Sequence, residues 1–542
     1  MTLPSPREWM GPGLLLALAL LGALIFTRHS GLPSFYDDSV DYLIMARDWT
    51  PWCESSSAIR EAALREHYPP LFPLLLASSG AACDLGQAHQ LVTLCFLVAL
   101  GAVYRLALDR LSSRLLAFLV SLCFLLSPAV WINLPGILSE NLYLALSLSA
   151  LLLALRQEAE SPRTWTGSLG LALLIAGVVL TRAIGITLLL AYGASLAIEL
   201  WRGPRRPWLP RLLPLLLPLA ALGLWRLLAP AGEGQLYSQD LWAIVQRLLQ
   251  GEIRAVVEGQ LIALHDAWFT SFLFYWTAHT EPRYLMVLVF GLLALGGVAW
   301  RLVGNHLDGW YGLFYLSLLL VWPYPGQFPR FLYGLLPVLM LQGLLAADIW
   351  SRHWRHRFRD HFRPGLILLL IVAVLPTLGF LVGRAGYDRE AEGQRLAGIA
   401  EFYRLPDLAK AVRVARESLF LIDAMKDIRH ATSPQARLYW QEPNYLNLLA
   451  DRRGVPTPAF TTQDRFLQEL LDGGGEYLLA SHLVPKGNAE KLDGLGLLAV
   501  IEGIAEPLWI KVEPGTDRLI AVLLRLDRER LQQRLKSPPA SP

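Results

Sequence analysis

The sequence predicts a polytopic α-helical membrane protein with about eleven transmembrane helices, followed by a small extracytoplasmic α/β domain. Of its 542 residues, 54% are hydrophobic and 17% are charged, against about 25% charged in an ordinary globular protein. Long apolar segments repeat through residues 1–383, whereas helix-like and strand-like patterns alternate through residues 384–542. The first part is therefore expected to be the membrane domain and the second a separate unit.

The apolar segments predict the spans in chain order. They lie at about 11–28, 87–108, 114–133, 137–156, 166–181, 184–201, 209–229, 284–303, 310–323, 331–350 and 364–383. The first is long enough to cross a bilayer at ~1.5 Å per residue and longer than most signal-peptide cores, so we expect it to stay uncleaved.

Basic residues predict the sidedness of the chain, because loops rich in Lys and Arg stay in the cytoplasm. The arginine-rich connections are 105–114, 202–211 and 351–363. The segments expected on the opposite side are 29–86, 231–282 and 384–542. No lysine precedes Lys410, so arginine supplies the cations of the membrane part, and its planar fork suits bidentate contact with phosphate. A net charge of +3 over this length gives no indication of nucleic-acid binding.

The second extracytoplasmic loop, 231–282, contains two amphipathic segments at about 238–256 and 260–276. The latter is rich in aromatic residues, which concentrate at membrane interfaces. We expect this aromatic segment to lie on the bilayer surface.

Residues 384–542 predict a small α/β domain. The expected helices are 405–430, 443–452 and 462–472, and the expected strands are 436–440, 476–480, 507–513 and 518–525. The segment has no GxGxxG, P-loop or nucleophile elbow, so nothing indicates chemistry of its own.

An acidic cluster follows the first span. As a helix, this stretch places Asp37, Asp38 and Asp41 close together beside Tyr42. Like charges at this spacing repel one another unless a cation or a binding site uses them. A proline-stiffened segment, His67-Tyr68-Pro69-Pro70, then returns the chain toward the membrane. The two pieces are expected to form one site.

Three charged residues fall at the outer ends of predicted spans, where each has two interpretations. Glu140 opens the fourth span and either caps that helix or belongs to a site. Arg182 stands at an extracytoplasmic helix junction and is either a snorkelling anchor or a phosphate ligand. Arg330 stands between proline turns and is either an interface anchor or a phosphate ligand.

Four cysteines lack any CxxC spacing, so neither a zinc knuckle nor a thioredoxin-type site is indicated. Cys95 and Cys123 lie in apolar runs and are expected to be packing residues. Cys53 and Cys83 both fall in the extracytoplasmic loop, where an oxidising compartment would allow a disulfide. Two unpaired thiols are the alternative.

Several short motifs resemble the GT-C membrane glycosyltransferases, the group that contains protein mannosyltransferases and the aminoarabinose transferase of lipid A. They are Asp37-Asp38-x-x-x-Tyr42-x-x-x-Ala46 with Tyr68-Pro69-Pro70-Leu71, then Ser139-Glu140-Asn141-Leu142, Leu180-Thr181-Arg182, and Arg330-Phe331-Leu332 through Pro337. The resemblance implies a sugar donor on a polyprenyl phosphate. It also implies that Asp37 is the catalytic carboxylate and that Arg330 faces the lipid-linked phosphate.

The resemblance also implies an inverting transfer of the sugar to an extracytoplasmic acceptor. The arginine-dominated composition fits a bacterial inner-membrane protein, with undecaprenyl or decaprenyl phosphate as the carrier. Asp37 would act as base and Asp38 would hold the acceptor or a metal. The other expected substrate-binding residues are Asp41, Tyr42, His67, Tyr68, Glu140, Arg182 and Arg330. A divalent metal, Mg²⁺ or Mn²⁺, would take oxygen ligands from Asp37, Asp38 and Glu140.

Two other classes of protein are compatible with the same residues. In a transporter or flippase of lipid-linked sugars, Glu140, Arg182 and Arg330 would line a translocation path. The sequence shows no pair of interrupted helices repeated between two halves, and its acids lie mainly in an outside loop, which favours the enzyme. A sensor with a solute-binding C-terminal domain is the third interpretation. For the enzyme, the C-terminal domain is expected to be a lid or an acceptor-docking module.

Overall fold

The computed structural model describes most of the chain. The described residues are 6–27, 38–66, 68–159, 164–203, 209–229, 235–273, 282–351, 356–387, 396, 399, 402, 405, 407–458, 460, 462–481, 497–513, 515 and 517–536. Asp37 and His67 therefore lie outside the described residues.

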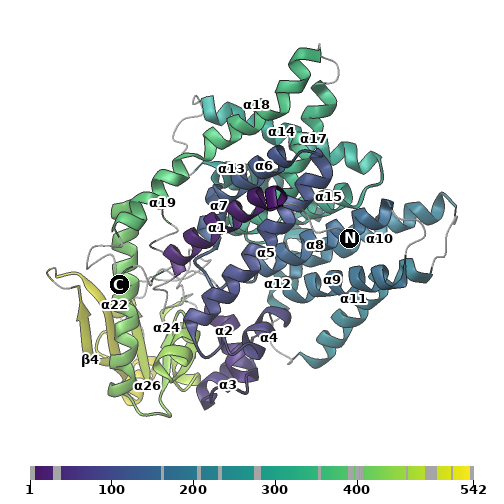
Figure 1. Ribbon diagram of the computed structural model, residues 1–542. Helices are drawn as coiled ribbons and strands as arrows, with labels where there is room; N and C mark the ends of the chain where they lie inside the picture. The colour runs from purple at the N-terminus through teal and green to yellow at the C-terminus, as the bar shows by residue number, and fades with distance from the viewer. Residues whose placement is uncertain are drawn as a thin grey trace.

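A helical bundle forms the larger part of the molecule (Figure 1). Its helices are α1 Pro6–Thr27, α5 Leu85–Leu111, α6 Arg114–Leu125, α7 Pro128–Asn133, α8 Glu140–Ala159, α9 Trp165–Thr181, α10 Ile186–Trp201, α11 Leu209–Leu228, α14 Pro282–Val303, α15 Leu307–Leu319, α16 Phe328–Tyr333, α17 Leu336–Ser351, α18 His356–Val374 and α19 Pro376–Tyr387. Two 3-10 turns, η1 Ala183–Gly185 and η2 Pro325–Gln327, precede α10 and α16.

Five helices among the described residues are long and apolar enough to cross a membrane. They span Leu85–Leu111, Ala183–Trp201, Pro210–Leu228, Pro282–Val303 and Pro364–Tyr387. The pair Pro325–Tyr333 and Leu336–Ser351, bent by 71°, would make a sixth, and three shorter apolar helices accompany them. The expectation of a multi-pass helical membrane protein is thus confirmed, while the count of about eleven spans stays a prediction.

Three predicted spans are broken where the sequence analysis expected one helix. The span 114–133 divides into α6 and α7 at Pro128, and the span 364–383 divides into α18 and α19 at Pro376. Arg330 does not begin the helix of the tenth span but lies in the separate short helix α16. Proline lacks an N–H and clashes with the preceding turn, which explains the first two breaks.

Helices occupy both loops predicted outside the membrane. The first loop contains α2 Ser39–Trp49, α3 Ser57–Ala63 and α4 Leu71–Ser78, and the second contains α12 Gln235–Leu249 and α13 Ile253–Phe272. The amide of Gln260 in α13 donates to the carbonyl oxygen of Trp322 at 2.9 Å. Tyr324 donates to Asp240 of α12. The second loop is therefore attached to the segment that leads into α16.

The C-terminal part has the predicted α/β character. Its elements are α22 Leu408–Ala431, β1 Arg437–Trp440, α23 Pro443–Tyr445, the π-helical turn η3 Leu446–Ala450, β2 Arg453–Pro456, α24 Gln463–Asp472, β3 Tyr477–Ser481, α25 Leu497–Val500, β4 Ala505–Val512, β5 Leu519–Leu526 and α26 Arg528–Lys536. The sheet order is β2-β1-β3-β5-β4, with β1 parallel to β2 and β3 and with β5 antiparallel to β3 and β4. The sequence analysis missed β2.

The C-terminal sheet lies beside the first loop, at the end of the molecule away from α18 (Figure 1). Arg453 of β2 pairs with Glu61 of α3 at 3.3 Å. Arg65 donates to the carbonyl oxygen of Gly454 at 3.4 Å. The acidic loop is thus in direct contact with the C-terminal domain.

Candidate active site

Two buried arginines hold one buried carboxylate. Oε1 of Glu140 lies 2.6 Å from Nη1 of Arg182 and also contacts Nε of Arg330. Glu140 is the first residue of α8, where the helix dipole favours a negative charge. A position at the start of α8 is therefore compatible with both interpretations of Glu140, a helix cap and a member of a site.

Each arginine is presented by an interruption of a helix. Arg182 has an extended backbone between α9 and η1, with φ −151° and ψ 144°. Gly185 permits this close turn, because an added Cβ would lie 2.4 Å from the carbonyl oxygen of Val178. Arg330 lies in α16, and Gly334 follows at the bend, where a Cβ would come within 2.9 Å of the Tyr315 hydroxyl.

Asp38 completes this group, which we name the Glu140 cluster and define as Asp38, Glu140, Arg182 and Arg330. Oδ2 of Asp38 lies 2.7 Å from Nη1 of Arg330. The side chains of Asp38 and Arg330 are 19% and 15% exposed, whereas those of Glu140 and Arg182 are 2% and 8% exposed. Within the cluster, Glu140 and Arg182 are therefore buried, whereas Asp38 and Arg330 are more accessible.

The cluster keeps unused hydrogen-bonding capacity. Among the described residues, Nη2 of Arg330 and Oε2 of Glu140 have no hydrogen-bond partner although both atoms are buried. A buried donor of this kind costs free energy unless a ligand or water completes it. An anionic oxygen would satisfy the guanidinium of Arg330.

Tyr42 and Ser139 connect α2 to the same cluster. Their hydroxyls are hydrogen-bonded at 2.9 Å, and Ser139 Oγ also accepts from Nη1 of Arg182 at 3.1 Å. Burial raises the pKa of the Tyr42 hydroxyl well above its ordinary value, so the group stays protonated at physiological pH. The Arg182 guanidinium lies over the Phe331 ring at 5.1 Å, which restricts its position further.

Asp41 and Tyr68 lie together beside the cluster. Tyr68 donates to Oδ2 of Asp41 at 3.2 Å, and its ring packs edge-on against Tyr42 with centroids 4.9 Å apart. The other oxygen of Asp41 accepts from Asn444 of the C-terminal domain at 2.7 Å. The acidic helix and the Pro-Pro turn are thus in contact, while their role as one substrate site stays a prediction.

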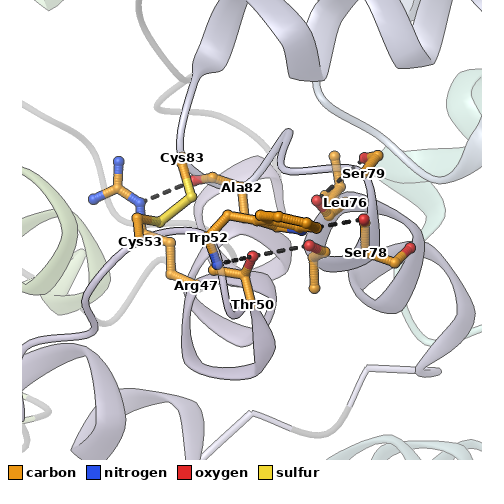
Figure 2. The surroundings of a disulfide bond; sticks show 10 residues. Arg47, Thr50, Trp52, Cys53, Leu76, Ser78, Ser79, Ala82 and Cys83 are labelled. Atoms are coloured by element: carbon orange, nitrogen blue, oxygen red, sulfur yellow. Dashed lines mark hydrogen bonds between the residues drawn. A yellow bond between two sulfur atoms is a disulfide. The ribbon is translucent and has the colours of Figure 1, made fainter.

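Cys53 and Cys83 form the expected disulfide, with an S–S distance of 2.09 Å (Figure 2). Around it, Arg47 donates to the carbonyl oxygen of Ala82 at 3.0 Å and Thr50 donates to that of Ala77 at 2.8 Å. These contacts hold the C-terminal end of α2 against the α4 segment. Asp38 lies at the other end of α2, on a helix whose C-terminal end is thus attached to the segment that leads into α5.

The described residues do not fit the predicted metal set. They contain no group of three His, Cys, Asp or Glu side chains arranged to hold an ion. Asp38 and Glu140 both pair with Arg330, whose charge repels a divalent cation. The third member, Asp37, lies outside the described residues, so a requirement for Mg²⁺ or Mn²⁺ stays a prediction and no step below passes through a metal.

Sequence analysis missed three residues that contact the site. Ser139 was quoted in a motif but given no role, and Glu66 and Asn444 were not considered. No signal in the sequence indicates Asn444, because its contact with Asp41 joins residues 403 positions apart.

No family model matches the chain, and no curated protein matches it in sequence. ArnT from Cupriavidus metallidurans in the apo state is similar in structure, with a TM-score of 0.49 and 14% identity over 94% of this chain and 97% of that chain. The Archaeoglobus fulgidus oligosaccharyltransferase tethered with an acceptor peptide has a TM-score of 0.47 and 12% identity, over 94% and 74% of the two chains. The mycobacterial arabinofuranosyltransferase AftD has a TM-score of 0.42 and 13% identity, over 97% and 42%.

All three TM-scores lie below 0.5, and these likenesses assign no reaction to this chain.

Proposed function

We propose that the chain is a membrane glycosyltransferase that moves a sugar from a polyprenyl-phosphate carrier to an acceptor outside the cytoplasm. The observation that supports this most is the Glu140 cluster, in which two buried arginines lie next to the acidic start of α2. Arginine is the side chain best suited to a phosphate, and a carboxylate beside it is suited to take a proton. The apolar helices would hold the polyprenyl tail.

Arg330 is the proposed phosphate ligand. Its Nη2 atom has no hydrogen-bond partner among the described residues, and its side chain is partly exposed. A phosphate oxygen would accept from Nη2 while Nη1 stays paired with Asp38 and Nε with Glu140, so Asp38 holds the guanidinium in the position that binds the donor. Arg182 would add a second positive charge to the site, and Glu140 holds both guanidinium groups in place.

The transfer step follows from this arrangement. The acceptor oxygen would attack the anomeric carbon and form the new C–O bond, while its proton passes to a carboxylate of the acidic cluster. The bond between the anomeric carbon and the phosphate oxygen would break, and its electron pair would stay on the phosphate, facing the arginines. A single displacement inverts the configuration at the anomeric carbon.

We assign the role of base to Asp37 and a role in holding the acceptor to Asp38. This assignment comes from the resemblance in the sequence, and it agrees with the ion pair that engages Asp38 with Arg330. The other proposed substrate contacts are Asp41, Tyr42, His67 and Tyr68. The proposed location is a bacterial inner membrane, with the site on the periplasmic side, where the loop disulfide would be stable.

A transfer assay on purified protein tests the proposal. Proteoliposomes would receive polyprenyl-phosphate hexoses and pentoses together with cell-envelope acceptors, and labelled product would be measured. Asp37→Asn should reduce transfer to background while binding of decaprenyl phosphate stays unchanged, because the amide keeps the shape but cannot accept the proton. Asp38→Asn should reduce transfer less if that residue only orients the acceptor.

Two outcomes would contradict the proposal. Full activity of Asp37→Asn would remove the assigned base. A wild-type protein that transfers no sugar, yet moves lipid-linked sugar between the leaflets of a vesicle, would identify a flippase instead.

A further inference from the structure

One amide of the C-terminal domain contacts two carboxylates of the acidic loop. Nδ2 of Asn444, in α23, lies 2.7 Å from Oδ1 of Asp41 and 2.7 Å from Oε1 of Glu66. An amide nitrogen carries two hydrogens and can donate one to each oxygen. The carboxylates of Asp41 and Glu66 are thereby held close together, although like charges repel.

The orientation of this amide is set inside the C-terminal domain. Asn447 donates to Oδ1 of Asn444 at 3.3 Å, and Oδ1 of Asn447 accepts from the backbone N–H of Gly454 at 2.9 Å. Gly454 and the preceding residue Arg453 both belong to β2, and Arg453 pairs with Glu61 of the acidic loop. The amide of Asn444 is therefore linked to strand β2 through Asn447, and it bonds the acidic loop at Asp41 and Glu66.

The first turn of α2 receives this contact and also makes the contacts of the active site. Asp41 accepts from Asn444, Asp38 pairs with Arg330 at 2.7 Å, and Tyr42 bonds Ser139 at 2.9 Å. Side chains three and four residues apart lie on one side of a helix. Any displacement of Asp41 therefore displaces Asp38 and Tyr42 as well.

We propose that Asn444 is a positioning residue, through which the docked C-terminal domain fixes α2 against the arginines of the Glu140 cluster. The inference rests on the proposed function, since it takes those arginines as the donor-phosphate site. Preorganised groups bind a ligand more tightly than groups that must first be ordered. The C-terminal domain thus contributes to donor binding through Asn444, which need not touch the donor itself.

Decaprenyl phosphate is the probe, and its affinity for the full-length protein in detergent is the measurement, read beside the melting temperature. Asn444→Asp places a third carboxylate against Asp41 and Glu66, and we expect the Kd to rise about tenfold. Asn444→Ala removes the amide without adding charge, and we expect a rise of about threefold. Arg465→Ala, on the exposed face of α24, is the matched control and should leave the Kd unchanged.

A rescue separates positioning from general loss of structure. Adding Glu66→Gln to Asn444→Asp exchanges the amide and the carboxylate between the two positions, so the number of carboxylates returns to two. We expect the Kd of this double variant to return to within about threefold of wild type. A substitution that only lowered the melting temperature would show neither the rise in Kd nor its recovery in the double variant.

The outcomes distinguish this inference from the proposed function. If Arg330→Ala abolishes binding while Asn444→Asp and Asn444→Ala bind as wild type does, the positioning role is wrong and the phosphate site stands. If Arg330→Ala also binds as wild type does, the phosphate site itself is wrong and the inference falls with it. If Asn444→Asp does not fold, the Kd of Asn444→Ala decides.

Discussion

Two places in the bundle each hold one carboxylate between two arginines. In the Glu140 cluster the arginines are Arg182 and Arg330. We name the second the Asp308 cluster and define it as Arg110, Arg301, Asp308 and Gln342. There Asp308 lies 2.8 Å from Nη2 of Arg110 and 2.9 Å from Nη2 of Arg301. Helix α15 begins at the Asp308 cluster and leads, about 20 Å further on, into the segment with Arg330.

The two clusters differ in the backbone that presents them. Arg110, Arg301 and Gln342 lie within the continuous helices α5, α14 and α17, and Asp308 lies in the first turn of α15. The residues of the Glu140 cluster instead lie at helix starts, at the break between α9 and η1, and in α16, part of a segment bent by 71° against α17. Irregular backbone within a membrane protein is tolerated where it is buried in protein or lines a water-filled cavity. This difference supports the proposal that the Glu140 cluster binds the donor phosphate, and we infer that the Asp308 cluster stabilises the bundle.

Arg330→Ala should give the largest effect and would test this division first. Removing the partly exposed guanidinium removes charge from the ground state and from the departing phosphate, so transfer should fall about 10²- to 10³-fold. Binding of decaprenyl phosphate should weaken in parallel, while the melting temperature changes little because Arg182 still pairs with Glu140. Unchanged donor affinity would move the phosphate site elsewhere, with Arg182 the next candidate.

Asp308→Asn should show the opposite pattern. It leaves two buried arginines without their carboxylate, and removing one partner of a buried ion pair destabilises a protein by about 3 kcal/mol. Thermal unfolding should therefore occur at a lower temperature, whereas transfer per folded molecule should match wild type. A loss of transfer without a loss of stability would contradict the assignment of this cluster to the fold.

The sequence predicted the helices of the bundle and the charged residues of the Glu140 cluster because both leave local signals. Apolar length marks a span, and a charge at the end of a span is costly enough to indicate a use. Glu140, Arg182 and Arg330 were selected in this way. The pairing of Glu140 with Arg182 and Arg330 joins residues 42 and 190 positions apart, which no local pattern records.

The Asp308 cluster escaped sequence analysis for a related reason. Asp308 falls in the short cytoplasmic connection expected between the spans 284–303 and 310–323, where charges are ordinary, and Arg301 lies near the cytoplasmic end of the first of these spans. Strand β2 was missed because Arg-Gly-Val-Pro is only four residues long, and it contains a glycine and a proline that disfavour strands. The roles of Asp37 and His67 stay predictions, since both lie outside the described residues.

The disulfide should affect one cluster and not the other. Replacing Cys53 and Cys83 by serine opens a loop with a sequence separation of 30, which costs about 3 kcal/mol in the chain-entropy model. We expect weaker binding of decaprenyl phosphate, because α2 carries Asp38, and the same result on treating wild type with a reductant. The Asp308→Asn variant should respond to the reductant as wild type does, and an unchanged donor affinity after reduction would show that the loop holds its position without the bridge.

The smallest predicted effects compare the neutral partner of each cluster. Ser139 accepts from Arg182 at 3.1 Å, and Gln342 donates to Asp308 at 2.9 Å. Each hydrogen bond to a charged group contributes about 1.5 kcal/mol. Ser139→Ala removes the link between Tyr42 and Arg182, so this free energy should appear as a several-fold higher Kd for decaprenyl phosphate. Gln342→Met keeps the volume and leaves the arginines of the Glu140 cluster untouched, so its loss should appear only in the free energy of unfolding. Equal effects of the two substitutions on donor affinity would show that helix breaks do not separate ligand-binding charges from structural ones in this bundle.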